Sequence, residues 1–197
     1  NFGMSETEIS TPDEFSLSGQ LLIAMPNMLD PSFAGSVVYL CEHSGKGAMG
    51  LVINRPTDLD IESLLEKINV DVAGYMPAHF PVMMGGPVAA ERGFVLHTEP
   101  LNWNSSLKVN DEISLTTSRD ILEAVARGEA PGKWLITLGY AGWGEGQLEE
   151  ELAQNAWLTV PANHEILFDT PLEERFASAY AMLGIDPALM SGAAGHA

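Results

Sequence analysis

The stretch Cys41-Glu42-His43-Ser44-Gly45-Lys46-Gly47-Ala48-Met49-Gly50-Leu51-Val52-Ile53-Asn54-Arg55-Pro56 is the most informative about the fold. The residues just before it, 37–40, are β-branched, aromatic or apolar and predict a strand over residues 36–43. Gly45 and Gly47 predict a turn, and residues 48–54 predict the partner strand. Pro56 should end that strand, because proline donates no hydrogen bond to a β-ladder. The stretch therefore predicts a β-hairpin, and it contains no recognisable catalytic or cofactor motif.

The rest of the chain alternates short apolar runs with turn residues. Further strands are predicted at residues 20–25, 81–84, 93–97, 112–116, 133–140, 157–160 and 165–168. Helices are predicted after the capping residues Asp60 and Ser118, and over residues 147–155 and 172–183. Strands outnumber helices and often follow one another through short turns. This pattern predicts an α+β fold with a mixed, mostly antiparallel sheet that curls into a partial or pseudo-barrel with flanking helices.

The chain is long enough for one well-packed domain. Residues 1–17 are polar and acidic and are expected to form a loose N-terminal segment. Residues 1–3 precede Met4 and are expected to be a cloning remnant. A single domain is expected over residues 18–197.

The charge balance is strongly acidic, with 27 Asp and Glu against 9 Lys and Arg and a formal net charge of -18. The few cations are scattered, whereas DNA binding requires several that neutralise phosphates, so direct contact with nucleic acid is not expected. No apolar run is long enough to span a bilayer, and no membrane contact is expected. The single cysteine excludes an internal disulfide, and the N-terminal residues show no secretory signal. These features favour a cytoplasmic location.

Four stretches carry a resemblance to a known family. They are residues 41–56, residues 85–88 with 92–97, residues 139–149 and the ending 193–197. Together they resemble the YqgE/AlgH family from about Gln20 to the C-terminus. The resemblance implies a small cytoplasmic bacterial protein with an α+β, pseudo-barrel-like fold. Members are often labelled transcriptional regulators after a genetic link to alginate production. The resemblance implies no enzymatic mechanism and therefore no catalytic residues.

Four glycines between Gly139 and Gly146 precede a predicted helix and suggest a phosphate-binding loop. The stretch lacks the Lys-Ser/Thr ending of a P-loop, and Glu145 would repel a phosphate. A structural turn that packs Trp143 is therefore favoured. The following residues, Glu149 to Glu151, are interpreted as a solvated helix face.

The five histidines are His43, His79, His97, His164 and His196. None has a partner at metal-ligand spacing, and no cofactor or metal is expected. His43 and His97 are expected to end strands and to bond to the backbone.

Cys41 has two interpretations. A free cysteine is often a small buried apolar residue, and this is the favoured reading. The alternative is a redox-responsive thiol, with Cys41 as the reactive group.

The leading functional interpretation is a non-enzymatic regulatory or interaction protein that acts through an unknown protein partner. The alternative is a small-ligand-binding protein or an enzyme with a site among three loops, at residues 54–56, 85–87 and 139–146. The candidate functional surface is Asn54, Arg55, Gly85, Gly86, Pro87 and Trp143. The guanidinium of Arg55 is expected to tie the end of its strand to a neighbouring turn, with the latter two loops as the expected partners. A pocket lined by both Arg55 and Trp143 would favour the alternative. The sequence leaves the oligomeric state open.

Overall fold

The computed structural model describes residues 16–184 apart from 27, 29, 73–79, 100–101 and 131. Most of the expected loose N-terminal segment, His79, His196 and the family-like ending lie outside these residues. The strands in the described part are β1 (Gln20–Ala24), β2 (Val37–Ser44), β3 (Gly47–Val52), β4 (Pro56–Asp60), β5 (Pro81–Met84), β6 (Val88–His97), β7 (Ser106–Lys108), β8 (Ser114–Thr116), β9 (Trp134–Trp143) and β10 (Trp157–Pro161). The helices there are the short 3-10 turn η1 (Pro31–Phe33), α2 (Ile61–Lys67), α3 (Arg119–Ala126), α4 (Gln147–Ala153), the π-helical turn η2 (Glu165–Asp169) and α5 (Leu172–Ala181).

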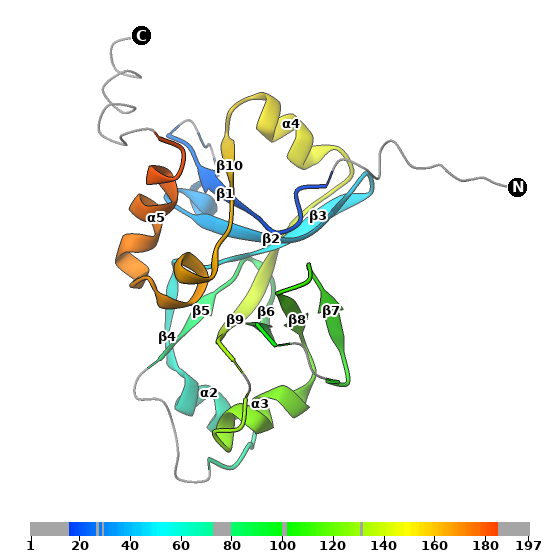
Figure 1. The fold of residues 1–197 in the computed structure, drawn as a ribbon, viewed down its shortest axis with the longest axis vertical. Coiled ribbons are helices and arrows are strands. Elements are labelled where there is room, and N and C mark those ends of the chain that lie inside the picture. The colour runs from blue at the N-terminus through cyan, green and yellow to red at the C-terminus, as the bar shows by residue number, and fades with distance from the viewer. Residues whose placement is uncertain are drawn as a thin grey trace, which may run out of the picture.

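The strands form two halves that share β9. One half has the order β10-β1-β2-β3-β9, and the other continues from β9 through β6 and β8 to β7, with β4 and β5 on the opposite edge. The C-terminal end of β9 pairs with β3, and its earlier part pairs with β5 and β6. Figure 1 shows β9 running from the lower half to the upper half. All described strand pairs are antiparallel except β5 with β9. This curled, mostly antiparallel sheet with several helices confirms the predicted α+β class.

Successive side chains of β2 point alternately into two different clusters of the hydrophobic core. Val37, Tyr39 and Cys41 belong to a central cluster that also contains residues of β6, η2 and α5. Val38 and Leu40 point to the opposite face and pack in a cluster with residues of β9, α4 and β10. Because successive strand side chains point to opposite faces, one apolar strand serves both clusters.

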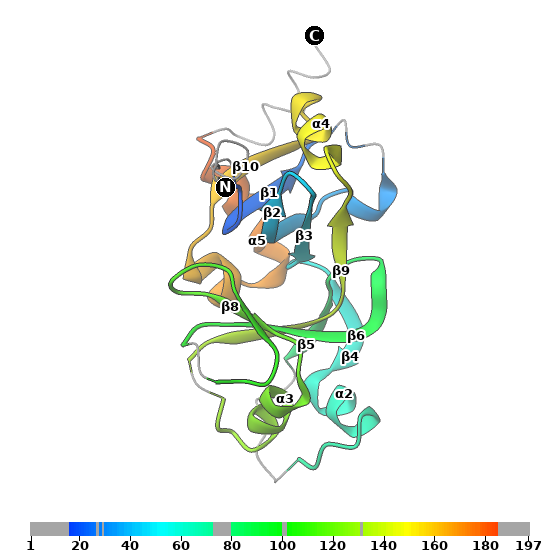
Figure 2. The same ribbon diagram turned by 90° about the vertical axis from the view of Figure 1, so that its right-hand side faces the viewer.

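The helices cover the sheets from several sides. A third cluster joins α2 and α3 to the lower half. Figures 1 and 2 show α4 at one end of the molecule and α2 with α3 at the other, while α5 lies beside the upper half. No helix in the described ranges is long and apolar enough to cross a membrane.

Two predicted helix caps can be checked directly. Asp60 caps α2, because its Oδ1 accepts a hydrogen bond from Ser63 N at 2.8 Å. Ser118 precedes α3 as predicted, but its hydroxyl donates to Asp120 Oδ1 at 2.5 Å instead of capping the helix.

The predicted strand at residues 165–168 is wrong, because these residues form the π-helical turn η2. Asn163 Oδ1 accepts a hydrogen bond from Ile166 N at 2.8 Å at the start of this turn. Ile166 and Leu167 both enter the central cluster, whereas neighbouring residues in a strand would point to opposite faces. A short apolar run does not distinguish these two cases in the sequence.

Candidate binding groove

An open groove of about 590 Å³ lies between the β2–β3 hairpin and the β7–β8 ribbon. Figure 2 faces this side, with the hairpin above β8 and β9 to one side. The groove is lined by Glu42, Ala48, Met49, Val88, Arg92, Phe94, Ser105, Ser106, Leu107, Leu115, Thr117, Tyr140, Gly142 and Trp143. These residues come from both halves of the molecule, so the curvature of the sheet creates the groove.

Aromatic rings and one arginine form the floor of the groove. The rings of Phe94 and Tyr140 meet edge to face, with centroids 5.5 Å apart. The guanidinium carbon of Arg92 lies 5.7 Å from the centroid of the Phe94 ring, within the range of a cation–π contact. Arg92 itself is exposed, so its donors remain available at the surface of the groove.

A chain of hydroxyl groups runs from the groove to a buried histidine. His97 Nδ1 lies 2.9 Å from the carbonyl oxygen of Thr98, which can only accept, so Nδ1 carries the proton. Burial lowers the pKa of His97, and the neutral ring then accepts at Nε2 from Thr116 Oγ1 at 2.6 Å. Thr116 therefore accepts from Ser106 Oγ at 2.5 Å. Ser106 donates into the wall and presents an acceptor to the groove.

The strand β7 borders the groove with a free edge. Val109 N donates to Ile113 O and Thr117 N donates to Ser105 O, which fixes the hydrogen-bonded positions of the β7–β8 pair. Because such positions alternate in an antiparallel pair, the backbone groups of residues 106 and 108 point away from β8. Among the described strands, β7 pairs with β8 alone. Its outer edge could therefore pair with another extended chain.

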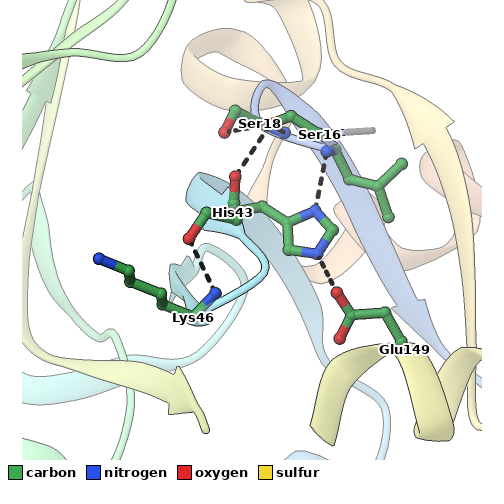
Figure 3. A network of polar contacts seen from close by, with 7 residues as sticks. Ser16, Ser18, His43, Lys46 and Glu149 are labelled. Atoms are coloured by element: carbon green, nitrogen blue, oxygen red, sulfur yellow. Dashed lines mark hydrogen bonds and ion pairs between the residues drawn. The ribbon is translucent and has the colours of Figure 1, made fainter. Parts of the chain in front are cut away.

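His43 lies on the far side of the hairpin and has a structural role. Its Nδ1 accepts a hydrogen bond from Leu17 N at 3.0 Å, and its Nε2 donates to Glu149 Oε2 at 2.8 Å. Figure 3 shows the ring between the chain at Ser16 and the helix that carries Glu149. Ser16 Oγ also donates to His43 O at 3.2 Å. The prediction that His43 bonds to the backbone is confirmed, and His43 also ties α4 to β2.

The sequence predicts that Glu149 to Glu151 form a solvated face of α4, but two of these three side chains make specific contacts within the protein. Burial raises the pKa of Glu149, but the hydrogen bond from His43, a backbone hydrogen bond and the charge interaction with His43 together outweigh it, so the net pKa is lowered. Glu151 accepts from the indole nitrogens of Trp143 and Trp157, at 3.0 and 2.8 Å. The prediction holds only for Glu150, which is exposed. In the described part of the chain no group of three His, Cys, Asp or Glu side chains could hold a metal ion.

The glycine-rich segment is only partly a turn, because residues 139–143 continue β9 and only residues 144–146 connect it to α4. Gly144 N donates to Gln147 Oε1 at 2.9 Å, so the protein itself uses this backbone donor. Trp143 is buried, as predicted, but it is the last residue of β9 and not part of a turn.

Gly85, Gly86 and Gly139 form a glycine seam where the chain after β5 crosses β9. Gly85 N donates to Leu138 O at 2.8 Å. A Cβ on Gly86 would lie 2.1 Å from the carbonyl carbon of Tyr140, and one on Gly139 would lie 2.4 Å from Gly86 O. Gly139 also has a φ of +76°, which disfavours other residues. The glycines thus allow two backbones to touch, and the seam has no room for a ligand.

Arg55 ties its segment to a turn, although not to the turns that were expected. Its two terminal nitrogens donate to the carbonyl oxygens of Ser32 and Ala34, beside η1. Asn54 supports the same turn by donating to Gly35 O at 2.9 Å. β3 ends at Val52, so the predicted role of Pro56 as a strand end is wrong: Pro56 begins β4.

Cys41 is buried, as the favoured interpretation predicted. Its sulfur lies 3.8 Å from Tyr39 O, and burial raises the pKa of the thiol. It sits at a bulge, where β2 has one residue more than β3 between successive pairs. A neutral, enclosed thiol gives no support to a redox role.

Of the six residues of the candidate functional surface, Trp143 lines the groove and the other five do not. Arg55 and Trp143 do not meet in it. Sequence reasoning missed Arg92, Ser106 and Tyr140, which carry most of the groove's polar and aromatic chemistry. Arg92 and Tyr140 lie in stretches that carry the family resemblance, but they match no catalytic or binding motif, and strands far apart in the chain bring the three residues together.

The fold and sequence place this chain in a family. It belongs to the AlgH-like family, whose model matches residues 21–188. This finding confirms the family resemblance.

Several relatives can be named. A UPF0301 protein of Burkholderia vietnamiensis is 57% identical over 187 residues, which cover 94% of this chain and 97% of that protein. A UPF0301 protein of Burkholderia ambifaria has the same identity and coverage. The solution structure of the AlgH protein from Pseudomonas aeruginosa has 49% identity and a TM-score of 0.76, covering 94% of this chain and 97% of that one. The crystal structure of protein DIP2367 from Corynebacterium diphtheriae shares the fold, with a TM-score of 0.62, 18% identity, and coverage of 88% and 87%.

Proposed function

We propose that this protein is a non-enzymatic regulatory or interaction protein of the bacterial cytoplasm, and that it binds an extended segment of a partner protein in the groove. The observation that carries this proposal is the floor of the groove, where Arg92, Phe94 and Tyr140 lie together beside the free edge of β7. Arginine and aromatic residues dominate the energetic centres of protein interfaces. A free strand edge can also give main-chain hydrogen bonds to an added strand.

The charges favour a protein partner over DNA. The net charge of -18 repels a phosphate backbone and steers partners with basic surfaces. Several of the nine cations are also engaged internally. Arg55, Arg119 and Arg175 donate to backbone carbonyls, and Lys133 pairs with Asp169. We therefore propose that any effect on transcription passes through the partner.

A photo-cross-linker tests where the partner binds. It is placed at Ser106 in the groove and, as a control, at Glu173, which is exposed on α5. We expect one protein to be captured from living cells at Ser106 and not at Glu173. Capture at both positions would mean that the groove has no special role.

The captured protein is then purified and titrated against two matched variants, Arg92→Ala and Arg127→Ala. Both remove one exposed arginine and change the net charge equally. We expect the first to weaken binding by about tenfold or more, as for a modest interface hot spot, and the second to have no effect. Equal effects, or a shift of duplex DNA by the purified protein at physiological salt, would contradict the proposal.

A further inference from the structure

Arg175 is a buried cation outside the groove. It lies in the first half of α5 and is only 5% exposed. Its Nε donates to Thr170 O at 2.9 Å, and its Nη1 donates to Ile53 O at 2.6 Å. Its Nη2 donates no hydrogen bond to any residue that the structure describes. The guanidinium therefore joins α5 to the end of β3 and keeps unused donors.

No carboxylate in the described residues forms an ion pair with Arg175. The charge of Asp169 acts on Arg175, but the carboxylate of Asp169 pairs with Lys133 at 2.5 Å. Burial lowers the pKa of Arg175 to about 10, and Asp169 partly opposes this effect. The side chain is still charged at neutral pH. A buried charge without a paired anion is costly, which suggests that an anion completes this site when it is bound.

A hollow of about 180 Å³ is lined in part by Arg175, and we call it the Arg175 hollow. Its walls are mainly apolar and include Phe80, Met83, Trp134, Ile136, Phe168 and Leu172. The rings of Phe80 and Trp134 meet edge to face at 5.9 Å. The hollow lies where η2 and α5 meet β5 and the start of β9, whose positions can be followed in Figure 1.

We propose that the Arg175 hollow binds a small apolar carboxylate, with the carboxylate on the guanidinium and the apolar body between the aromatic walls. Arginine presents donors in a planar arrangement that matches a carboxylate. An apolar cavity of about 150 Å³ holds a benzene ring, so this hollow suits an aromatic acid or a short branched aliphatic acid.

The same features disfavour other anions. A phosphate has no apolar body to fill the walls and carries more charge than one guanidinium can balance. Asp169 would also repel a dianion more strongly than a monoanion, although Lys133 offsets part of its charge. The Arg175 hollow is separate from the groove, because no residue lines both of them.

The test is a titration of the full chain, followed by two-dimensional NMR, with three probes that separate charge from shape. Benzoate has both the ring and the carboxylate, benzamide keeps the ring without the charge, and acetate keeps the charge without the ring. We expect saturable benzoate binding with shifts centred on Thr170, Leu172 and Met83. Benzamide and acetate should each bind at least about tenfold more weakly than benzoate.

A matched pair of variants, Phe80→Ser and Met84→Ser, tests the site without removing the buried guanidinium. Arg175→Gln removes the cation but also threatens the contacts to Thr170 and Ile53. Phe80→Ser changes an exposed wall residue, and Met84→Ser is its control, because Met84 is similarly exposed but does not line the hollow. We expect Phe80→Ser to weaken benzoate binding severalfold and Met84→Ser to leave it unchanged.

Three outcomes would overturn the proposal. One is no saturable benzoate shift at concentrations on the order of 10 mM, which is weak even for so small a ligand. Another is equal affinity for benzoate and benzamide, because the guanidinium would then have no role. The third is a set of shifts centred on the groove residues Met49 and Leu107.

Discussion

The strand β9 borders two regions that differ in packing, the glycine seam and the groove. At the seam, Gly86 and Gly139 bring two backbones so close that a single added carbon would clash. Three residues further along, Gly142 opens onto the groove, and an added carbon would meet only Tyr140 and Val88 side chains at 3.4 and 3.9 Å. The comparison shows that a run of glycines in one strand can serve close packing at one point and an open surface at the next.

The largest expected effect breaks the seam. Gly86→Ala would place a Cβ 2.1 Å from the backbone of Tyr140, where no side-chain movement can relieve the clash. We expect a loss of about 3 kcal/mol or more of unfolding free energy, at the upper end of overpacking costs. Urea denaturation measures it. Gly93→Ala is the control, because a Cβ there meets nothing within 4 Å, and an equal loss in both variants would contradict the packing explanation.

The next prediction concerns the stability and thiol reactivity of two neighbouring positions on β2. Cys41 is buried, whereas Glu42 lines the groove. Cys41→Ser should lose roughly 1–3 kcal/mol, because it buries a hydroxyl in place of a weakly polar thiol. In the native protein, Cys41 should react with a thiol reagent only on unfolding. In a Cys41→Ser, Glu42→Cys double variant, labelling should be fast. Rapid native labelling of Cys41 would instead favour the redox interpretation.

A smaller effect is expected on the pH dependence of stability, through His97, which is buried behind the wall of the groove. Burial lowers the pKa of His97 below its usual 6.5, so unfolded chains take up a proton that folded chains do not. The contribution of His97 to stability is therefore complete above pH 6.5 and declines as the pH falls below it. His97→Gln should make the unfolding free energy less dependent on pH between 7 and 5.5. His164→Gln, at a partly exposed side chain, is the control, and an unchanged slope in the His97 variant would contradict a buried neutral ring.

The smallest expected effect on stability is at the groove floor. Arg92→Ala removes an exposed side chain whose described contact is with the Phe94 ring. The unfolding free energy should change by about 0.5 kcal/mol or less, as for most surface substitutions. A thermal denaturation curve checks this directly. A large loss would show that Arg92 holds the fold together and would weaken its assignment to binding.

Much of the fold could be predicted from local pattern. The β2–β3 hairpin follows from β-branched residues around a glycine turn, and the start of α2 follows from the Asp60 cap. The segment at residues 165–169 could not be predicted, because Asn163 and the demands of the central cluster decide its conformation. The sequence also offered no sign that Arg175, within an acidic helix, would be buried.

The groove was largely beyond sequence reasoning for a different reason. Arg92, Ser106 and Tyr140 are ordinary residues in three strands, and only the curvature of the sheet brings them together. Gly85 and Gly86, two members of the candidate functional surface predicted from the sequence, belong instead to the seam, where they are needed for backbone contact. Trp143 was the exception, since it was identified from the sequence and also lines the groove.

The most direct test of the contrast along β9 is the unfolding free energy of Gly139→Ala and Gly142→Ala, measured side by side in urea. At Gly139 the positive φ and the contact with Gly86 O should together cost about 2 kcal/mol or more. Gly142→Ala should stay within about 0.5 kcal/mol of the parent, because its new methyl group points into an open groove. Equal losses at the two positions would contradict the division of β9 into a closed seam and an open binding surface.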